Sequence, residues 1–597
     1  VWLDRFTIRN LEIFFPNTVE GKCLIDVIDH TISPMGGRLL KRWLALPSTD
    51  SELIFKRHNI VEYFINKDKH RGLLIETLST ISDLERLVSK VATKKINPRE
   101  LFTLNESLKN IKPLKKEFKK TKSDDLNLLF KSLSNCEEII NLIGSTLSEA
   151  PPVNIIKGNT ISSDFSNELK ELRSLSKNNK DFLDDMLKEQ SEITNIPSLK
   201  ISSNNVFGYY IEVRNTHKDK VPESWIRKQT LVNAERYITE ELKEYESKIL
   251  GAEQRIMELE MKIFDELLNS CQSHIKEIQN NSSIIAELDC LVSFSSLSVL
   301  KNYVRPEIDD SFDIEIINGK HPVIESQLPI DKPYIPNSIY LNKKNQQIIM
   351  ITGPNMSGKS AILRQTAIIC LLAQIGCFVP AEKLKMGIID KIFTRVGASD
   401  NISMGESTFM VEMNETALIL NNISERSLIL LDEIGRGTST YDGISIAWAI
   451  SEYLHQHHLK PKTLFATHYH ELNQMKDSFE RIKNFNVSIK EENNQILFLR
   501  KLIPGSSEHS FGIHVAKMAG MPKDVLNKAN DMLRQLEQSR SSKELIVNEI
   551  SPQLEFFNIS DPILEELKND LENLNLDELT PIEALLKLNE LKRKINN

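Results

Sequence analysis

Residues 351–360 have the types and spacing of a phosphate-binding loop. They read ITGPNMSGKS and fit the pattern G-x-x-x-x-G-K-[ST]. Glycines let such a backbone curl, so that successive N–H groups point at anionic oxygens. The Lys359 ammonium suits the β- and γ-phosphates of a nucleotide, and the Ser360 hydroxyl suits Mg²⁺. The predicted nucleotide-binding residues are Gly353, Pro354, Asn355, Met356, Ser357, Gly358, Lys359 and Ser360.

Such a loop needs a strand before it and a helix after it, and the flanking sequence has both patterns. Residues 348–351 are a continuous apolar run, which is typical of a buried strand. Residues 361–375 predict an apolar helix that ends at Gly376. The positive end of this helix dipole would face the bound phosphates. This context favours a nucleotide site over a glycine-rich turn that matches the pattern by chance.

A second apolar run, residues 428–431, ends in Asp432 and Glu433. Continuous apolar runs are typical of parallel strands buried on both faces, and the carboxyl ends of such strands carry the chemistry. We expect Asp432 to hold Mg²⁺ through water, together with Ser360. We expect Glu433 to act as the general base that polarises the attacking water.

A third run, residues 463–466, ends in Thr467 and His468, and His468 is a plausible sensor of the γ-phosphate. Each of these signals is common by itself. Their order downstream of Lys359 favours a nucleotide-hydrolysing site over a non-catalytic one. The predicted catalytic residues are Glu433, Lys359 and His468.

The composition limits the classes of protein that fit. A chain of 597 residues is too long for one hydrophobic core, so we expect several domains. The formal net charge of −8 argues against a surface that is basic all over, so contacts to nucleic acid must come from local patches. Six scattered cysteines with no C-x-x-C pair indicate a reduced, intracellular, metal-free protein. We see no signal peptide and no membrane span.

Residues 1–182 have mostly helical periodicity, including a helix expected after Pro34–Gly37. The basic run at residues 109–122 carries seven lysines and one glutamate. We interpret this run as a solvated helix face or loop rather than a DNA contact.

The residue composition changes at residues 206–213. These residues are aromatic and β-branched, which predicts a strand. The stretch that follows is basic, and Trp225 lies within it. Cationic side chains on a small β-rich module could grip a phosphate backbone without reading sequence, although an ordinary basic surface fits equally well. The candidate DNA-binding residues are Arg214, Lys218, Lys220, Arg227 and Lys228.

Apolar residues then recur at steps of four and three from Ile238 to Ile263. This heptad seam predicts one helix over residues 238–280, on the order of 60 Å long. We expect it to act as a strut packed against a second long helix at residues 164–192. The basic module lies between these two helices in sequence, which predicts that they carry it at their tip.

The motifs taken together resemble the MutS family of DNA mismatch-repair ATPases, of the ABC ATPase class. The matching stretches are TGPNMSGKS at 352–360, FTRVGA at 393–398 with ESTFMVEM at 406–413, LDEIGRGTSTYDG at 431–443 and FATH at 465–468. The resemblance also includes LDRFTIRNLE at 3–12 and the 209–246 module, and it covers essentially the whole chain.

The resemblance implies a multidomain fold, with a small β-rich DNA clamp inserted into a helical lever. An α/β ABC-type P-loop ATPase and a C-terminal helix-turn-helix follow. The implied domains are lever 1–182, DNA clamp 183–242, returning lever helix 243–305, ATPase 306–505, dimerising helix-turn-helix 506–540 and acidic tail 541–597.

The resemblance also implies site residues and partners. Tyr334 would stack on adenine, and Ser407 would reach the γ-phosphate of the partner subunit in a homodimer, with a tetramer as the alternative assembly. The implied cofactors are ATP and Mg²⁺, and the implied partners are double-stranded DNA, MutL and the β sliding clamp. QLEFF at 553–557 is similar to sliding-clamp docking peptides, with a tail-packing anchor as the alternative, and 579–595 resembles an oligomerisation helix. The implied location is the bacterial cytoplasm, near the nucleoid.

The chain departs from the family pattern at two points. Ala361 replaces the usual threonine, outside the phosphate contacts. The chain also begins where the lever begins, so we expect it to be a fragment without the mismatch-reading and connector domains, able to clamp DNA but not to discriminate mismatches. The alternatives are a MutS-related recombination clamp and a transporter-type or chromosome-structural ABC ATPase. The missing LSGGQ stretch and the short spacing from Lys359 to Asp432 argue against the second.

Overall fold

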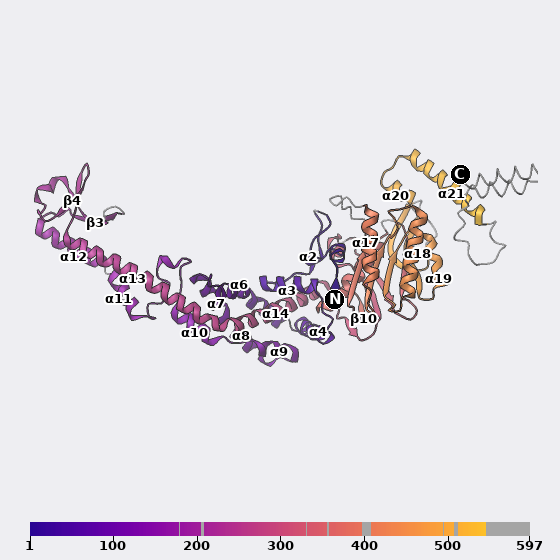
Figure 1. Ribbon diagram of the computed structural model, residues 1–597, viewed down its shortest axis with the longest axis horizontal. Coiled ribbons are helices and arrows are strands. Elements are labelled where there is room, and N and C mark those ends of the chain that lie inside the picture. The colour runs from indigo at the N-terminus through magenta and orange to yellow at the C-terminus, as the bar shows by residue number, and fades with distance from the viewer. Residues whose placement is uncertain are drawn as a thin grey trace, which may run out of the picture. The chain divides into compact units, whose positions relative to one another are not determined.

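The computed structural model describes most of the chain as two units, Val1–Phe511 and Gly512–Asn597 (Figure 1). The described residues are 1–18, 20–177, 179–204, 208–329, 331–354, 357–396, 407–492, 495–506 and 512–544. The proposed sliding-clamp peptide at 553–557 and oligomerisation helix at 579–595 lie outside them, as do Asn355 and Met356 of the phosphate loop.

The first part of unit 1 is helical, as the periodicity predicts. Its helices are α1 (Arg5–Asn10), α2 (Leu24–Ile28), α3 (Pro34–Ala45), α4 (Ser51–Asn66), α5 (Asp68–Ser79), α6 (Leu84–Ala92), α7 (Pro98–Lys109), α8 (Ile111–Glu117), α9 (Asp124–Ser132) and α10 (Glu137–Thr146), with 3-10 turns η1 (Phe118–Lys120) and η2 (Ile155–Lys157). Pro34 and the two glycines lie inside α3 rather than before it, because Ser33 caps the helix and proline is tolerated at the first helical position.

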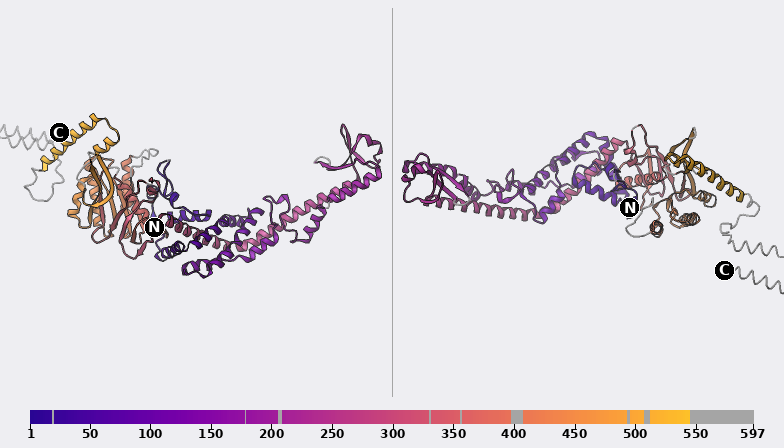
Figure 2. Two further views of the ribbon diagram at one scale, coloured as in Figure 1. Left: turned by 180° about the vertical axis from the view of Figure 1, so that it is seen from behind. Right: turned by 90° about the horizontal axis from the view of Figure 1, so that it is seen from above.

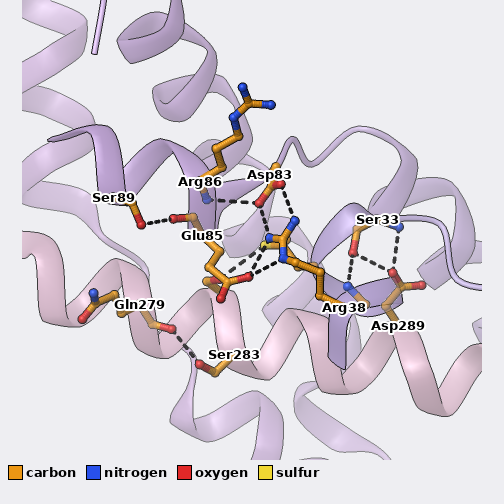
Figure 3. A network of polar contacts seen from close by, with 12 residues as sticks. Ser33, Arg38, Asp83, Glu85, Arg86, Ser89, Gln279, Ser283 and Asp289 are labelled. Atoms are coloured by element: carbon orange, nitrogen blue, oxygen red, sulfur yellow. Dashed lines mark hydrogen bonds and ion pairs between the residues drawn. The ribbon is translucent and has the colours of Figure 1, made fainter. Parts of the chain in front are cut away.

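A buried carboxylate fixes the start of α3 (Figure 3). Asp289 accepts hydrogen bonds from the backbone N–H of Ile32 at 2.9 Å and from the N–H and Oγ of Ser33 at 2.7 and 2.6 Å. The Ser33 hydroxyl in turn accepts from the N–H of Gly36 at 3.1 Å. Asp289 thereby satisfies donors that the helix itself leaves unpaired, and joins two segments 256 residues apart.

The long return helix differs from the prediction. In place of one helix over 238–280, the chain forms α13 (Glu240–Cys271), a 3-10 turn η4 (Gln272–His274) and α14 (Ile275–Lys301). Figure 2 shows this stretch in magenta to pink. The seam pattern stops near Ile263. Helix α14 packs against α3, α4, α5 and α6, and nearly all of its residues from 284 to 298 are buried, so a different burial pattern sets its length. By length and composition the stretch Glu240–Lys301 could cross a membrane, but 72% of its most apolar window is buried within the protein, as in the core helix of a globular domain.

The partner of α13 is α11 (Asn167–Lys177), which α12 (Asn179–Thr194) follows in the chain. Arg173 bonds to Glu260 of α13, and Glu260 is fully buried. The predicted pairing of the two helical segments is therefore observed for α11.

A four-stranded antiparallel sheet lies between α12 and α13 in the sequence. Its strands are β2 (Lys200–Asn204), β3 (Gly208–Arg214), β4 (Ile226–Thr230) and β5 (Ala234–Ile238), in the order β2-β3-β5-β4, with the 3-10 turn η3 (Asn215–Lys220). Trp225 is buried at 8% exposure, with its ring 6.0 Å from that of Tyr237. Trp225 is therefore part of this module's own small core rather than of its charged surface.

The remainder of unit 1 is α/β, as predicted. A seven-stranded sheet has the order β1-β11-β12-β13-β9-β14-β15, and a four-stranded sheet has the order β6-β10-β7-β8. The strands are β1 (Trp2–Leu3), β6 (Glu307–Asp309), β7 (Ile314–Gly319), β8 (Asn337–Leu341), β9 (Ile348–Thr352), β10 (Lys383–Gly387), β11 (Lys391–Arg395), β12 (Ser427–Asp432), β13 (Lys462–Ala466), β14 (Ile482–Glu492) and β15 (Gln495–Pro504). The helices are α15 (Pro322–Gln327), α16 (Lys359–Ile375), α17 (Thr408–Asn421), α18 (Thr440–Gln456) and α19 (Met475–Ser478), with the 3-10 turn η6 (His470–Gln474).

The central strands are buried on both faces. On β9, Ile349 and Ile351 belong to the core cluster that includes α16, whereas Ile348 and Met350 belong to the cluster that includes α17 and α18. This alternation explains why the strand reads as a continuous apolar run. The chain start also joins this sheet, because β1 pairs in parallel with β11. Residues 2–3 therefore contribute to the sheet, although the periodicity placed them with the helices.

Unit 2 contains two described helices, α20 (Gly512–Met518) and α21 (Lys523–Glu544). Gly520, at a φ of +84°, lies in the turn that joins them.

Candidate nucleotide-binding site

The phosphate loop leaves the carboxyl end of β9 and enters α16. Gly358 is the N-cap residue of α16 and has a φ of +100°, a conformation that side chains other than glycine rarely adopt. Gly353, at a φ of +143°, follows the strand directly. The predicted strand and helix on either side of the loop are thus observed, and Gly376 ends α16 in the left-handed conformation.

Lys359 is held inside this loop. Its side chain is 5% exposed, and its Nζ donates to the carbonyl oxygens of Gly353 at 2.7 Å and Pro354 at 3.2 Å. Burial lowers the pKa of Lys359, while the nearby carboxylates Glu433 and Asp432 act in the opposite direction. The ammonium is therefore preorganised beside the backbone that would surround a phosphate.

Asp432 and Ser360 meet at the same edge of the sheet. Strand β12 pairs with β13, and β13 pairs with β9, so the ends of the three parallel strands are aligned. Asp432 is 7% exposed, and its Oδ1 is buried without a hydrogen-bond partner among the described residues. Burial raises the pKa of Asp432, and a hydrogen bond from the Ser360 side chain opposes the rise. An unsatisfied carboxylate oxygen next to a hydroxyl is a donor set that fits Mg²⁺.

Glu433 lies in a strained backbone conformation directly after β12. Its φ is +52°, and its N–H donates to the carbonyl of Ala466 at 2.9 Å. A left-handed conformation at a residue other than glycine has an energetic cost and is common at functional sites. The Glu433 carboxylate accepts a hydrogen bond from Nη1 of Arg436 at 2.6 Å. The backbone conformation thus sets the direction of the Glu433 side chain, and Arg436 holds its carboxylate in place.

His468 lies beyond the end of the neighbouring strand β13. Burial lowers the pKa of its imidazole, and the nearby Glu433 carboxylate partly offsets this effect. Its ring centroid is 4.2 Å from that of Tyr469. A neutral imidazole near Glu433 and Lys359 can donate or accept one hydrogen bond at a phosphate oxygen.

The segment after Glu433 is fixed by groups from other elements. The N–H of Gly435 donates to Glu412 Oε1 at 2.6 Å, and the Tyr469 hydroxyl donates to the carbonyl of Gly435 at 2.9 Å. Glu412 is buried and pairs with Arg395 at 3.4 Å. Nothing in the local spacing signals these contacts, because the residues come from α17, β11 and the region after β13.

Tyr334 and Ser407 were expected to contact nucleotide by resemblance alone. The Tyr334 hydroxyl donates to Gln365 Oε1 at 2.9 Å, which places Tyr334 against α16, the helix that begins at the phosphate loop. Burial raises the pKa of this phenol. Ser407 is exposed at the N-cap of α17, and its hydroxyl makes no capping hydrogen bond. It remains available to an external group.

The five candidate DNA-binding residues all lie on exposed parts of the four-stranded module. Arg214 ends β3, Lys218 and Lys220 lie in η3, and Arg227 and Lys228 lie in β4. Arg227 pairs with Glu235 at 3.5 Å. A further cation, Arg236, lies 4.3 Å above the Tyr210 ring and pairs with Glu212, so it stabilises the module itself.

Comparison with known proteins identifies the family. The profile of MutS domain III matches residues 6–295, and that of MutS domain V matches residues 349–537. A protein of Christiangramia forsetii named DNA mismatch repair protein MutS is 60% identical over 602 residues, covering 100% of this chain and 69% of that protein. The proteins of that name from Flavobacterium psychrophilum and Parabacteroides distasonis are 59% and 54% identical, with the same shares covered. With matches this high along its whole length, the chain belongs to the MutS family of DNA mismatch-repair proteins.

Proposed function

We propose that the chain is an ATP-driven DNA clamp of mismatch repair, which hydrolyses ATP to change how it holds duplex DNA. The observation that carries this proposal is the edge of the seven-stranded sheet. There Asp432 and Glu433 lie at the end of β12, which is aligned with the end of β9, and the loop that leaves β9 leads to Lys359 at the start of α16. Among the described residues, the buried Oδ1 of Asp432 has no hydrogen-bond partner. The relatives are named for DNA mismatch repair, in agreement with this assignment.

The hydrolysis mechanism follows from the side chains at this edge. Backbone N–H groups of the loop and the Lys359 ammonium bind the phosphates, and Tyr334 stacks on adenine. Ser360 and, through water, Asp432 would hold Mg²⁺, which when bound neutralises the charge of the phosphate oxygens. Glu433 accepts the proton of the attacking water, and for this step its pairing with Arg436 must loosen. His468 contacts the γ-phosphate oxygens as a neutral hydrogen-bonding group.

The assembly and the partners complete the proposal. Ser407 reaches the γ-phosphate of a partner subunit, so the site is shared across a homodimer, and residues 506–540 lock the two ATPase parts together. Residues 1–182 and 243–305 serve as the lever, 183–242 as the clamp and 306–505 as the ATPase. Double-stranded DNA is the substrate, MutL and the β sliding clamp are partners, and the location is the cytoplasm. Neither the recombination clamp nor the chromosome-structural ATPase is favoured by the comparisons.

The test measures how the chain holds DNA. On a closed circular duplex, or a linear duplex blocked at both ends, ATP should convert bound protein into a form that dissociates much more slowly than from the same duplex with free ends. The control is ADP in place of ATP. Equal dissociation rates with both nucleotides and on both kinds of duplex would show that the protein is not an ATP-driven clamp.

A further inference from the structure

A cavity of about 510 Å³ opens between α8, η1 and α9, away from the nucleotide site, and lysines dominate its lining. Phe130 of α9 contributes an aromatic side chain to the lining, and the described lining residues include no carboxylate. We call this cavity the lysine pocket. The lysines that line it are Lys112, Lys115, Lys116, Lys119 and Lys131. Four of them belong to the basic run at residues 109–122, whose composition is typical of a solvated helix face or loop.

Packing beneath the pocket fixes the elements that carry the lysines. The rings of Phe118 and Phe130 stack in parallel with centroids 4.5 Å apart, which joins η1 to α9. Asn127 accepts from Thr121 Oγ1 at 2.7 Å and donates to the Thr121 carbonyl at 2.9 Å, which closes the connection between the same two elements. The packing and hydrogen bonds between η1 and α9 thus fix the backbone that carries the lysines of the pocket.

The positive charge of this pocket is mostly uncompensated. Lys112 pairs with Glu137 at 2.9 Å, and Lys112 lowers the pKa of that carboxyl. Lys115 donates to the backbone carbonyl of Leu133, which carries no net charge. The other three lysines, Lys116, Lys119 and Lys131, are exposed and make no ion pair with a described carboxylate.

We propose that the lysine pocket binds a small anion that carries two or more phosphate groups. Several ammonium groups around one concavity repel one another, and a ligand with several anionic oxygens relieves that repulsion while accepting charge-assisted hydrogen bonds. Lysine is a suitable point charge for phosphate, and a cavity of this size is in the range of small-molecule sites.

A nucleic-acid backbone fits this geometry less well. A duplex spreads one negative charge over about every 1.7 Å of its axis along a convex surface. The five lysines instead converge on one hollow, where a compact ligand can meet several of them at once. The pocket and the proposed clamp function are independent, so each can fail without the other.

The test is titration of inorganic tripolyphosphate into the chain by calorimetry, in a Lys359→Ala background that weakens the nucleotide loop. The variant Lys116→Gln, Lys119→Gln and Lys131→Gln should bind at least about tenfold more weakly, because each lost ammonium removes a charge-assisted contact. A matched control carries the same charge change at exposed lysines outside the pocket, as Lys41→Gln, Lys56→Gln and Lys95→Gln, and should bind as the parent does.

If Lys359→Ala does not fold, the same titration in the otherwise unchanged chain counts sites, and the pocket variant should lose one of two. Replacing the three lysines by arginine should retain binding, because the charge is kept. Equal losses in the pocket and control variants, or no tripolyphosphate binding to the parent, would overturn the proposal. The proposal also fails if the pocket variant loses duplex DNA affinity while tripolyphosphate binding is unchanged.

The phosphate groups could belong to a free oligophosphate or to a nucleoside triphosphate, and a second titration distinguishes these two ligands. A nucleoside triphosphate titrated without Mg²⁺ should bind as tightly as tripolyphosphate if the pocket recognises phosphates alone. Tighter binding of the nucleotide, lost in a Phe130→Leu variant, would assign the base to the aromatic side of the pocket. Both results support an oligophosphate site and differ only in the ligand that occupies it.

Discussion

At the scale of single residues, the chemistry depends on where Glu433 points. Its left-handed backbone is set by the hydrogen bond to Ala466, and its carboxylate is held by Arg436 at 2.6 Å. The substitution Glu433→Gln keeps the shape and can still hydrogen-bond to Arg436, but an amide does not accept the proton of water. We expect steady-state ATP hydrolysis to fall by about 10²- to 10⁴-fold with ATP binding preserved.

The measurement is phosphate release at saturating ATP, with nucleotide affinity measured separately. A matched control is Glu425→Gln, an exposed carboxylate that pairs with Lys343. If Glu433→Gln hydrolyses ATP at the parental rate, Glu433 is not the base.

Lys359 has a separate role, because it holds the loop and would bind phosphate. Lys359→Ala removes the donor to Gly353 and Pro354 as well as the charge. We expect nucleotide affinity to fall by about 10- to 100-fold, the effect of losing a charged hydrogen bond. Equilibrium binding of a fluorescent ATP analogue measures this, with Lys391→Ala as the control. Unchanged affinity would refute the assigned role.

At the scale of elements, helix ends are fixed by side chains that come from far away in the sequence. Asp289 on α14 accepts hydrogen bonds from the N–H and the hydroxyl of Ser33, the residue that caps the start of α3 (Figure 3). Ser33→Ala removes both the cap of α3 and one partner of a buried carboxylate, so we expect the free energy of unfolding to fall by about 1–3 kcal/mol.

Urea denaturation measures that change. Ser283→Ala is the control, because Ser283 is exposed on α14 and bonds only to the carbonyl of Gln279. A loss at Ser283 equal to the loss at Ser33 would mean that the cap contributes nothing specific.

Two buried histidines make the free energy of unfolding depend on pH. Burial lowers the pKa of His58 on α4 and of His321 at the start of α15 to about 3. Because the unfolded imidazoles bind protons near pH 6.5 and the folded ones do not, their contribution to stability is present above pH 6.5 and is lost as the pH falls towards 3. Each histidine should lower the free energy of unfolding by about 2 kcal/mol between pH 7 and pH 5.

Urea denaturation across that pH range tests this coupling. His58→Leu should flatten the pH dependence, whereas replacement of an exposed histidine, His458→Leu, should leave it unchanged. If the pH dependence of His58→Leu equals that of the parent, the imidazole of His58 is not held neutral by burial.

At the scale of the whole molecule, a protein with net charge −8 must bind DNA through local patches. Three exposed cations of the four-stranded module, Lys218, Lys220 and Lys228, make no ion pair with a described carboxylate. If they contact phosphates, changing all three to glutamine should weaken duplex binding at every sequence and reduce the slope of log K against log salt by about 3.

Fluorescence anisotropy over a range of salt concentrations measures that slope. The triple change Lys41→Gln, Lys56→Gln and Lys95→Gln has the same effect on net charge and should leave the slope as it is. Equal slopes for the module variant and the parent would place the DNA contacts elsewhere.

The sequence by itself determined the elements whose signals are local. The phosphate loop, the helix that ends at Gly376, and the strands ending at Asp432 and Ala466 all follow from short-range patterns of burial and backbone conformation. A strand over residues 206–213 was predicted for the same reason, since these residues are aromatic and β-branched, and β3 (Gly208–Arg214) lies there.

Only the tertiary structure decided what depends on distant contacts. The long helix divides at residues 272–274, because α14 is buried among α3 to α6 rather than along a seam. Glu412 of α17 and Tyr469, which follows β13, hold Gly435 in the segment after β12 from separate elements. The lysine pocket exists because the stacked rings of Phe118 and Phe130 fold η1 onto α9, so that a run of charges which reads as a solvated face lines a cavity. Periodicity reports which face of an element is buried, but the partner that buries it is set by packing across hundreds of residues.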